Sequence, residues 1–346
     1  MTSLKINPNV AIIILNWNGW KDTIECLESL YQINYSNHDV VLVDNNSKDD
    51  SILKIKEYLE GKLHPKSDYF EYDVKNKPID IIEYIYDGIE IIKEDNENFQ
   101  NSHSNNKLIL IKNDRNYGFA EGNNIGIQHA LKFLNSDYVL LLNNDTVVDK
   151  QFLDILIKAE SSSDNTGVFG PTIYWYDDKI KIQSAGVKLY SKLGIQKVLG
   201  LNEIDIGQFK DISSVDYVSG CALLAKSEIF KEIGFLDRDY FLYWEEVDWC
   251  YRAHNAGYDI VHVPDGKIWH KGSVSSTSAS KVYYMTRNCF WFMKRNVTQQ
   301  QYAVFLVFFF TLLFWYRSFI LAFYYRDLKR LKCYYKGVKT GFRRYK

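Results

Sequence analysis

Three short polar stretches carry residue types that could do chemistry. The first, Asn143-Asn144-Asp145, directly follows the apolar run 139–142. Carboxylate and amide oxygens are hard ligands that suit Mg²⁺ or Mn²⁺, so Asp145 is a candidate metal ligand and Asn143 a second. Turns are also rich in Asn and Asp, and it is the position at the end of a buried strand that favours the metal interpretation.

The second stretch, YFLYWEEVDWCYR (240–252), places three acids among aromatic side chains. Burial and crowding raise the pKa of a carboxyl group, which suits a general base near neutral pH. Glu245, Glu246 and Asp248 are the candidates. A solvated helix face is the usual explanation for such acids, but four aromatics within nine residues do not suit an exposed face.

The third stretch, VPDGKIWHKG (263–272), contains a single histidine. A histidine beside a tryptophan is more often a packed structural residue than a ligand. His270 becomes a ligand candidate only in company with Asp145 and a diphosphate.

Glycines 118, 122 and 126 recur every four residues in NYGFAEGNNIG (116–126). They permit close approach of a ligand or a backbone near a helix N-terminus, where free N–H groups favour phosphate. For Gly126 we expect helix–sheet packing instead. The chain contains neither Gly-x-Gly-x-x-Gly nor a Walker A sequence, which argues against a dinucleotide enzyme and a P-loop NTPase.

The elements that must position these residues alternate between strand and helix. Apolar runs at 10–15, 40–43, 108–111 and 138–142 each end in Asn or Asp and are separated by helical patterns. Near-continuous apolar strands predict a mostly parallel sheet covered on both faces, with ligands beyond its carboxyl ends. Asp44, at one such end, could accept from a base or ribose hydroxyl, or simply cap a loop.

The pattern degrades between residues 63 and 107, which we interpret as a partly mobile insertion without chemistry. The C-terminal part differs again. Residues 302–325 carry one charge, Arg317, and 24 helical residues reach about 36 Å, enough to cross a bilayer. A buried helix of a soluble domain is the alternative. From Arg326 onward, nine Lys and Arg face one Asp, which predicts a cytoplasmic tail near anionic headgroups.

The overall charge of −1 gives no global attraction to nucleic acid. The five cysteines are widely spaced without a Cys-x-x-Cys pair, and the N-terminus lacks a signal-peptide layout. These features indicate a reducing compartment.

In this order, the stretches resemble family 2 glycosyltransferases with the GT-A fold, of the rhamnosyltransferase-like kind. The resemblance covers about residues 9–295 and rests on VAIIILNWNG, VVLVDNNSKDDS, NDRNYGFAEGNNIGI, LLLNNDT, the 218–258 stretch and IWH. It implies an α/β GT-A domain at 1–295, followed by a hydrophobic helix and basic tail at 296–346.

The resemblance also implies roles for single residues. A nucleotide-sugar, with uridine or thymidine as base, would contact Asn16, Trp17, Asn18, Asp44, Asn46, Asn116, Gly118, Asn123 and Asn144. Asn143-Asn144-Asp145 stands at the family's Asp-x-Asp metal motif, which implies Mg²⁺ or Mn²⁺ on Asp145, Asn143 and His270. Glu246 stands where the family has a general base, usually Asp, with Glu245 and Asp248 as alternates. Lys271 or Arg287 could assist the diphosphate.

The implied activity is inverting transfer of a sugar to a hydroxyl of a glycan or polyprenyl-linked acceptor, at the cytoplasmic face of the cell membrane. The membrane contact would be made by 302–346. Two alternatives remain: a catalytically silent nucleotide-sugar-binding scaffold, prompted by Asn143 and Glu246, and a nucleotidyltransferase. The second would be expected to have a Gly-rich basic loop where this chain has NWNGW.

Overall fold

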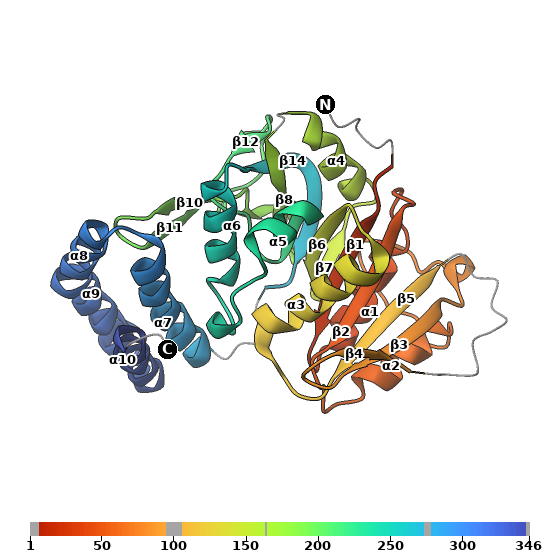
Figure 1. Cartoon of the computed structure of the whole chain (residues 1–346), viewed down its shortest axis with the longest axis horizontal. Helices are drawn as coiled ribbons and strands as arrows, with labels where there is room; N and C mark the ends of the chain where they lie inside the picture. The colour runs from red at the N-terminus through yellow and green to blue at the C-terminus, as the bar shows by residue number, and fades with distance from the viewer. Residues whose placement is uncertain (1–6, 95–105, 163–164, 273–277, 344–346) are drawn as a thin grey trace.

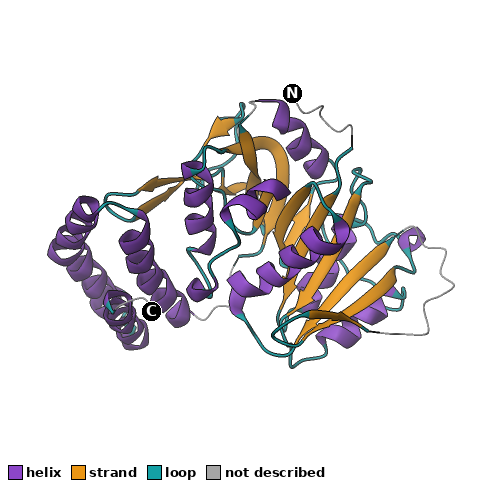
Figure 2. Cartoon of the chain, in the orientation of Figure 1, coloured by secondary structure: helices purple, strands orange, loops and turns teal. Residues whose placement is uncertain are grey.

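A mixed β-sheet runs through the centre of the molecule, and helices cover both of its faces. The helices at the C-terminal end of the chain stand beside this part, at the left of the view (Figure 1). The computed structural model describes residues 7–94, 106–162, 165–272 and 278–343. Strands and helices alternate over the first half of the chain, as the sequence predicts (Figure 2).

The parallel half of the sheet has the strand order β3-β5-β2-β1-β6. Its elements are β1 (Val10–Asn16), α1 (Trp20–Leu30), β2 (His38–Asp44), α2 (Ser51–Leu59), β3 (Asp80–Tyr86), β5 (Lys107–Asn113), α3 (Gly118–His129), a π-helical turn (Ala130–Leu134) and β6 (Tyr138–Asn143).

Helices bury both faces of this half, which explains its apolar strands. Ile12 and Ile14 of β1 belong to the buried cluster that contains α1 and α2, whereas Ala11 and Ile13 belong to the cluster that contains α3. A Cβ at Gly126 would lie 2.5 Å from Ile13 Cγ2, so this glycine is required for helix–sheet packing, as expected.

The other half of the sheet is mixed and continues from β6 in the order β13-β8-β14-β12. Its elements are β7 (Thr146–Val148), α4 (Phe152–Lys158), η4 (Ala159–Ser162), β8 (Thr166–Trp175), β9 (Asp178–Ser184), β12 (Ser213–Ser214), β13 (Ala222–Lys226), α5 (Ser227–Ile233), η5 (Arg238–Tyr240), α6 (Glu245–Asn255) and β14 (Asp259–His270).

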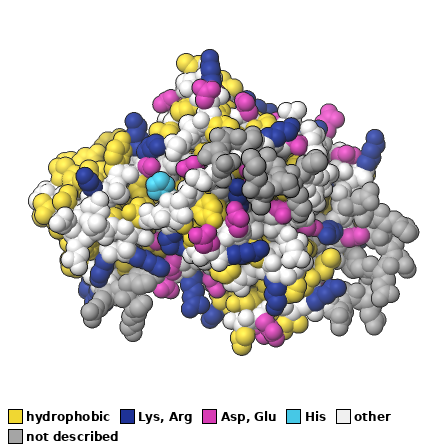
Figure 3. Space-filling view, turned by 45° about the horizontal axis from the view of Figure 1, so that its top comes forward, with side chains coloured by type: hydrophobic (Ala, Val, Ile, Leu, Met, Phe, Trp, Pro, Cys, Tyr) yellow, Lys and Arg dark blue, Asp and Glu magenta, His cyan; other side chains and the backbone are white. Residues whose placement is uncertain are grey.

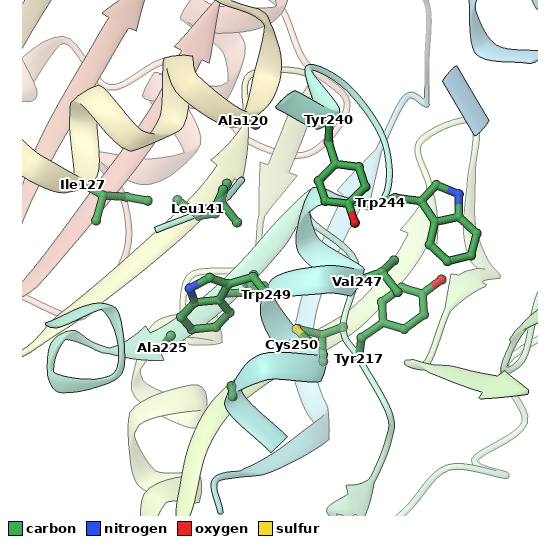
Figure 4. Close-up of a cluster of buried hydrophobic side chains, with 14 of the residues drawn as sticks. Ala120, Ile127, Leu141, Tyr217, Ala225, Tyr240, Trp244, Val247, Trp249 and Cys250 are labelled. Atoms are coloured by element: carbon green, nitrogen blue, oxygen red, sulfur yellow. The ribbon is translucent and has the colours of Figure 1, made fainter. Parts of the chain in front are cut away.

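A separate hairpin is formed by β10 (Val187–Tyr190) and β11 (Ile195–Val198). Helix α6 is anchored by its apolar face: Val247, Trp249 and Cys250 lie in one buried cluster with Leu141 and Ala225 of the sheet (Figure 4).

Part of the expected insertion is integral to the fold. Strand β3 pairs in parallel with β5 along its full length, and β4 (Ile91–Lys93) forms the edge beside it. The short helix η1 (Val74–Asn76) is followed by Lys77, whose Nζ forms a buried ion pair with Glu28 at 2.8 Å. Residues 73–93 are therefore anchored to the rest of the fold, and 95–105 lie outside the described residues.

The C-terminal helices are α7 (Ser278–Asn296), α8 (Gln299–Phe308), the π-helical η6 (Phe309–Leu313), α9 (Phe314–Phe319), the π-helical η7 (Ile320–Tyr324) and α10 (Leu328–Phe342). Residues 299–324 form one continuous 26-residue helix, long and apolar enough to cross a membrane.

Exposed apolar side chains cover much of that helix, and hydrophobic side chains gather at the left of Figure 3 over this region. The basic segment is not a loose tail, because most of it is the helix α10, which packs on α7. A Cβ at Gly337 would lie 2.8 Å from the carbonyl oxygen of Tyr283, and one at Gly341 would lie 3.0 Å from that of Arg287.

Candidate active site

One buried carboxylate joins the loops that follow β1 and β2. Asp44 is 1% exposed, and its Oδ1 accepts from Asn16 Nδ2 at 2.7 Å and from Ser47 Oγ at 2.6 Å. The Ser47 N–H donates to the second oxygen of Asp44 at 2.9 Å, and Thr23 Oγ1 donates to Asn16 Oδ1 at the same distance. Asp44 and Asn16 therefore fix the shape of both loops from beneath.

Trp17, Asn18 and Asn46 form the outer layer of this edge. Asn18 Oδ1 accepts from the Lys48 N–H at 2.7 Å, and Asn46 Nδ2 donates to the carbonyl oxygen of Asp114 at 2.6 Å. Both asparagines have a positive φ, 53° and 61°, a conformation that Asn tolerates better than most residues. The Trp17 side chain is 45% exposed and presents an aromatic surface at the rim.

Asn45, which the motif comparison does not single out, connects this edge to the loop after β5. Its Nδ2 donates to Asn116 Oδ1 and to the Gly118 carbonyl oxygen, both at 3.0 Å. Its Oδ1 accepts from Asn113 Nδ2 at 3.1 Å and from the Tyr117 N–H at 3.0 Å. All four hydrogen-bonding positions of the amide are used. The signal was an amide directly after a strand-ending Asp.

The start of α3 packs against Phe241, in the loop before α6. Gly118 has φ 79°, and a Cβ there would lie 2.4 Å from the Phe241 ring. The N–H groups of Phe119 and Ala120 lie 2.6 and 3.4 Å from the Phe241 carbonyl oxygen. Asn123 is buried and donates to the Phe119 carbonyl oxygen within the helix. In this structure the Phe241 carbonyl oxygen accepts from the N–H groups for which the sequence predicts a phosphate.

The turn between β6 and β7 carries the candidate metal ligands. Asn144 Nδ2 donates to Thr23 Oγ1 at 2.9 Å and lies 3.4 Å from the Gly19 carbonyl oxygen, which anchors the turn to the first loop. Gly19 permits this approach, since a Cβ there would lie 2.8 Å from Asn144 Nδ2. Asn143 Nδ2 lies 3.4 Å from His270 Nε2.

Strand pairing brings His270 to Asp145. Because β7 pairs antiparallel with β14, His270 lies opposite Thr146, the neighbour of Asp145. His270 Nε2 lies 3.1 Å from Asp145 Oδ1, and His270 Nδ1 lies 2.6 Å from Gln183 Oε1. A carbonyl oxygen only accepts, so Nδ1 carries a hydrogen, and Nε2 is the ring nitrogen that faces Asp145. Gln183, on β9, was not predicted from the sequence.

This pair fits a divalent cation. Two ligands at about 2.1 Å from an octahedral ion and at right angles to each other are about 3.0 Å apart. The observed separation of Asp145 Oδ1 and His270 Nε2 is 3.1 Å. No group of three or more His, Cys, Asp or Glu that could hold a metal occurs in the described ranges. The other positions would therefore be filled by water, an amide or substrate phosphates, as is usual for Mg²⁺ sites.

The two candidate cations for the diphosphate are engaged elsewhere. Lys271 Nζ donates to Asp22 Oδ1 and Glu25 Oε2, each at 2.6 Å. Burial lowers the pKa of Lys271, but the hydrogen bonds and charges of these two acids outweigh burial and raise it. The Arg287 guanidinium lies 4.0 Å from the centre of the Trp291 ring and donates to backbone carbonyl oxygens. The structure does not support a diphosphate contact for either side chain.

The two glutamates at the start of α6 differ in their pKa shifts. Burial, followed by the charge of Glu246, raises the pKa of Glu245 well above its usual range. Burial also raises the pKa of Glu246 above 4.5. Within the described chain, Oε2 of each has no hydrogen-bond partner. Burial therefore opposes ionisation of both carboxyl groups, and the charge of Glu246 further opposes that of Glu245.

Asp248 has a structural role. It is fully buried, and Arg252 Nε donates to its Oδ2 at 2.9 Å. Its Oδ1 accepts from Asn296 Nδ2 at 2.8 Å and from the Tyr240 hydroxyl at 3.2 Å. These contacts occupy both oxygens, which corrects the expectation that Asp248 could act as an alternate base.

The loop before α6 is strained and held from α7. Phe241, Tyr243 and Trp244 have φ values of 65°, 67° and 77°, which are rare for bulky residues. Asn288 is fully buried beneath this loop. Its Nδ2 lies 3.0, 2.9 and 2.7 Å, respectively, from the carbonyl oxygens of Tyr240, Leu242 and Tyr243. Sequence reasoning missed Asn288, which lies in a helix without a recognisable motif.

A short turn separates the acids of α6 from the candidate metal ligands. A Cβ at Gly220 would lie 3.4 Å from Glu246 Cβ, and the Asn143 N–H donates to the Cys221 carbonyl oxygen at 2.9 Å. Burial raises the pKa of the Cys221 thiol to about 12, and the charges of Asp145 and Glu246 add to this shift. The carboxylates of Asp145 and Glu246 are therefore both close enough to Cys221 for their charges to raise the pKa of its thiol.

Comparison with known proteins places these residues in a family. The model of "Glycosyltransferase like family 2" matches residues 88–298, and that of "Glycosyl transferase family 2" matches 11–75.

Curated relatives are similar over part of the chain. A hexosyltransferase of low-salt glycan biosynthesis, Agl10 from Haloferax volcanii, is 28% identical over 54% of this chain and 60% of its own length. The dTDP-rhamnosyl transferase RfbF from Shigella flexneri is 26% identical over 55% and 64%. An N-acetylglucosaminyl-diphospho-decaprenol L-rhamnosyltransferase from Mycobacterium tuberculosis is 27% identical over 39% and 47%. The chain thus spans less than two thirds of these relatives.

Solved structures show the same fold. A mannosyltransferase from Pyrobaculum calidifontis, in complex with GDP-Man and Mn²⁺, superposes with a TM-score of 0.55 at 12% identity, over 97% of this chain and 87% of that one. TarS (1–349) from S. aureus, in complex with UDP-GlcNAc, gives 0.53 at 14% identity, over 96% and 80%. The predicted GT-A fold is confirmed.

Proposed function

Because the chain belongs to glycosyltransferase family 2, we propose that it moves a sugar from a nucleoside-diphosphate sugar to an acceptor hydroxyl, with inversion at the anomeric carbon. The observation that carries this proposal is the placement of Glu246 on one side of the Gly220–Cys221 turn and Asp145 with His270 on the other.

We assign the general base to Glu246. Its carboxylate takes the proton of the acceptor hydroxyl as the hydroxyl oxygen attacks the anomeric carbon. The bond from that carbon to the diphosphate oxygen breaks, and the nucleoside diphosphate leaves. The raised pKa of Glu246 suits proton transfer near neutral pH. In this proposal Glu245 is protonated, because burial and the charge of Glu246 raise its pKa, and it adds no second negative charge beside the base.

Asp145 and His270, with Asn143 beside them, would hold Mg²⁺ or Mn²⁺. Such an ion, when bound, stabilises the charge that develops on the leaving diphosphate. Gln183 orients His270 for this role by accepting from Nδ1. The Mn²⁺ in the Pyrobaculum calidifontis complex supports the assignment.

The exposed face of Trp17 would stack on the nucleotide base, while the loops held by Asp44 and Asn45 shape the surface beneath it. The base is uridine or thymidine in this proposal, in line with the dTDP-rhamnosyl transferase among the relatives.

The acceptor in this proposal is a saccharide carried on a lipid diphosphate at the cytoplasmic face of the membrane. Two observations support it: the relative that is named for a diphospho-decaprenol acceptor, and the exposed apolar helix 299–324 followed by basic α10. The enzyme would act in the synthesis of cell-surface glycans.

The test is to incubate the full-length protein with a panel of UDP-, dTDP- and GDP-sugars and Mn²⁺ or Mg²⁺, and to measure released nucleoside diphosphate. Release from one donor, lost in Asp145→Ala and Glu246→Gln, is the expected result. Metal-dependent donor binding without any turnover, with or without lipid-linked acceptor, would instead identify a silent scaffold.

A further inference from the structure

A cavity lies away from the candidate active site, between α7, η7 and the start of α10. Its volume is about 380 Å³, within the usual range for ligand sites. Met285, Ile320 and Leu321 contribute to an interior that is largely apolar, and three cations, Lys281, Arg317 and Arg330, line it as well. This combination suits an amphiphile with an anionic head.

The three cations are only partly neutralised. Arg330 forms an ion pair with Asp327 at 3.1 Å. Neither Lys281 nor Arg317 has an acidic partner among the residues that the structure describes, and both are exposed. The two unpaired cations can attract phosphate oxygens, and the apolar residues that line the same cavity can contact a hydrocarbon chain.

The cavity lies between two features: the strained loop before α6, called the base loop because it precedes Glu246, and the exposed apolar surface of the helix 299–324. Lys281 Nζ lies 5.6 Å from the centre of the Tyr243 ring, and the Tyr284 ring stacks on Phe241 at 5.4 Å. Tyr243 stands three residues before Glu246. On the other side, η7 ends the helix whose apolar side chains are exposed, so a hydrocarbon chain could leave the cavity along that surface.

We propose that this cavity binds the diphosphate of the lipid-linked acceptor, with Lys281, Arg317 and Arg330 on the phosphate oxygens and the hydrocarbon chain along the apolar helix. The saccharide on that diphosphate then points toward Tyr243 and Glu246. This assignment rests on the proposed function and gives it an acceptor site. A bilayer phospholipid shares the phosphate chemistry, but the cavity's contact with the base loop favours the acceptor.

The test uses the full-length protein in phosphatidylcholine nanodiscs and measures binding of farnesyl diphosphate by calorimetry. We expect it to bind at least about tenfold more tightly than farnesol or inorganic diphosphate, because both parts of the ligand contribute. Lys281→Ala and Arg317→Ala should each weaken binding about tenfold or more. Lys294→Ala, at the far end of α7, is the matched control and should bind like the wild type.

Equal affinity in the wild type and both cavity variants would overturn the proposal. So would loss of farnesyl diphosphate binding when phosphatidylglycerol replaces phosphatidylcholine, which would identify a phospholipid site. If the variants fail to fold, amine labelling of the wild type replaces them: farnesyl diphosphate should protect Lys281 and not Lys294, and equal labelling of Lys281 with and without the ligand counts against the site.

Donor turnover by the wild type separates the two proposals. Turnover without farnesyl diphosphate binding overturns the acceptor site alone. Binding at Lys281 and Arg317 without turnover of any donor keeps the site and overturns the proposed function.

Discussion

Asn288→Asp tests whether the strained loop before α6 positions the base. The substitution keeps the shape of the side chain but replaces its donating amide by an oxygen. That oxygen would face three backbone carbonyl oxygens that now lie 2.7 to 3.0 Å from Nδ2. The loop should therefore lose its main support without a change in packing volume.

The magnitude follows from the strain and the bonds that oppose it. Three bulky residues at positive φ cost about 1–3 kcal/mol each, or roughly 3–9 kcal/mol together. The two hydrogens of Asn288 Nδ2 are shared among three carbonyl oxygens and count as two hydrogen bonds, Arg287 adds two, and the start of α3 two more. At about 0.5–1.5 kcal/mol each, these six offset the strain, and the two from Asn288 amount to about 1–3 kcal/mol.

Without Asn288 the loop should relax and displace Glu246. A displacement of about 1 Å costs on the order of a hundredfold in rate. We expect kcat for nucleoside diphosphate release to fall about a hundredfold, KM for the donor to change less than about threefold, and Tm to fall by about 2–6 °C.

Asn255→Asp, at the exposed end of α6, is the control and should change none of kcat, KM and Tm. Asn288→Ala removes the donor without adding repulsion and should give an intermediate loss, which keeps the comparison informative if the Asp variant folds poorly. A folded Asn288→Asp enzyme with wild-type kcat would refute the positioning role.

Four further outcomes follow from the site. Glu246→Gln should lower kcat by about 10²–10⁴ while Glu245→Gln retains most of it, because Gln mimics the protonated Glu245; equal loss in both would reverse the assignment. The acidic limb of kcat/KM should lie above pH 4.5, since burial raises the pKa of Glu246. The folded protein binds the Glu245 proton more tightly than the unfolded chain, so the stability of the wild type falls as pH rises above 4.5. Glu245→Gln has no such proton to lose, so its Tm relative to the wild type should increase from pH 5 to pH 8. A Tm difference that stays constant over this range would contradict the raised pKa. Gln183→Leu frees His270 Nδ1 and should weaken Mn²⁺ binding about 10–100-fold, as measured by electron paramagnetic resonance, with unchanged affinity arguing against a metal role for His270.

The sequence predicts the first half of the fold well, because each buried strand is a continuous apolar run that stops at a polar residue. The sequence also named Asp145 and His270 as candidate metal ligands, and β-pairing of Val147 and Val148 with β14 explains why these two side chains lie together. The turn that carries Asp145 is apolar again after the polar residues because those two valines form a short strand.

The supporting residues could not be predicted, since their roles depend on distant contacts. Gln183 acts on a histidine 87 positions away, and Asn288 holds a carbonyl 48 positions away. Nothing local distinguishes either from an ordinary amide. Asp248 shows the opposite case. Its sequence neighbours suggested an active acid, but Arg252 and Asn296 donate hydrogen bonds to its two carboxylate oxygens.

The contact of α10 with α7 has a consequence for protein engineering. Helix α7 carries Asn288, which supports the loop before α6, and the same helix packs against Gly337 and Gly341 of α10. A fragment cut after Asn296 to improve solubility would strip α7 of this cover, so its inactivity would say little about the need for a membrane. Exchanging anchors between homologous enzymes should preserve activity only when α7 and α10 are transferred as one module.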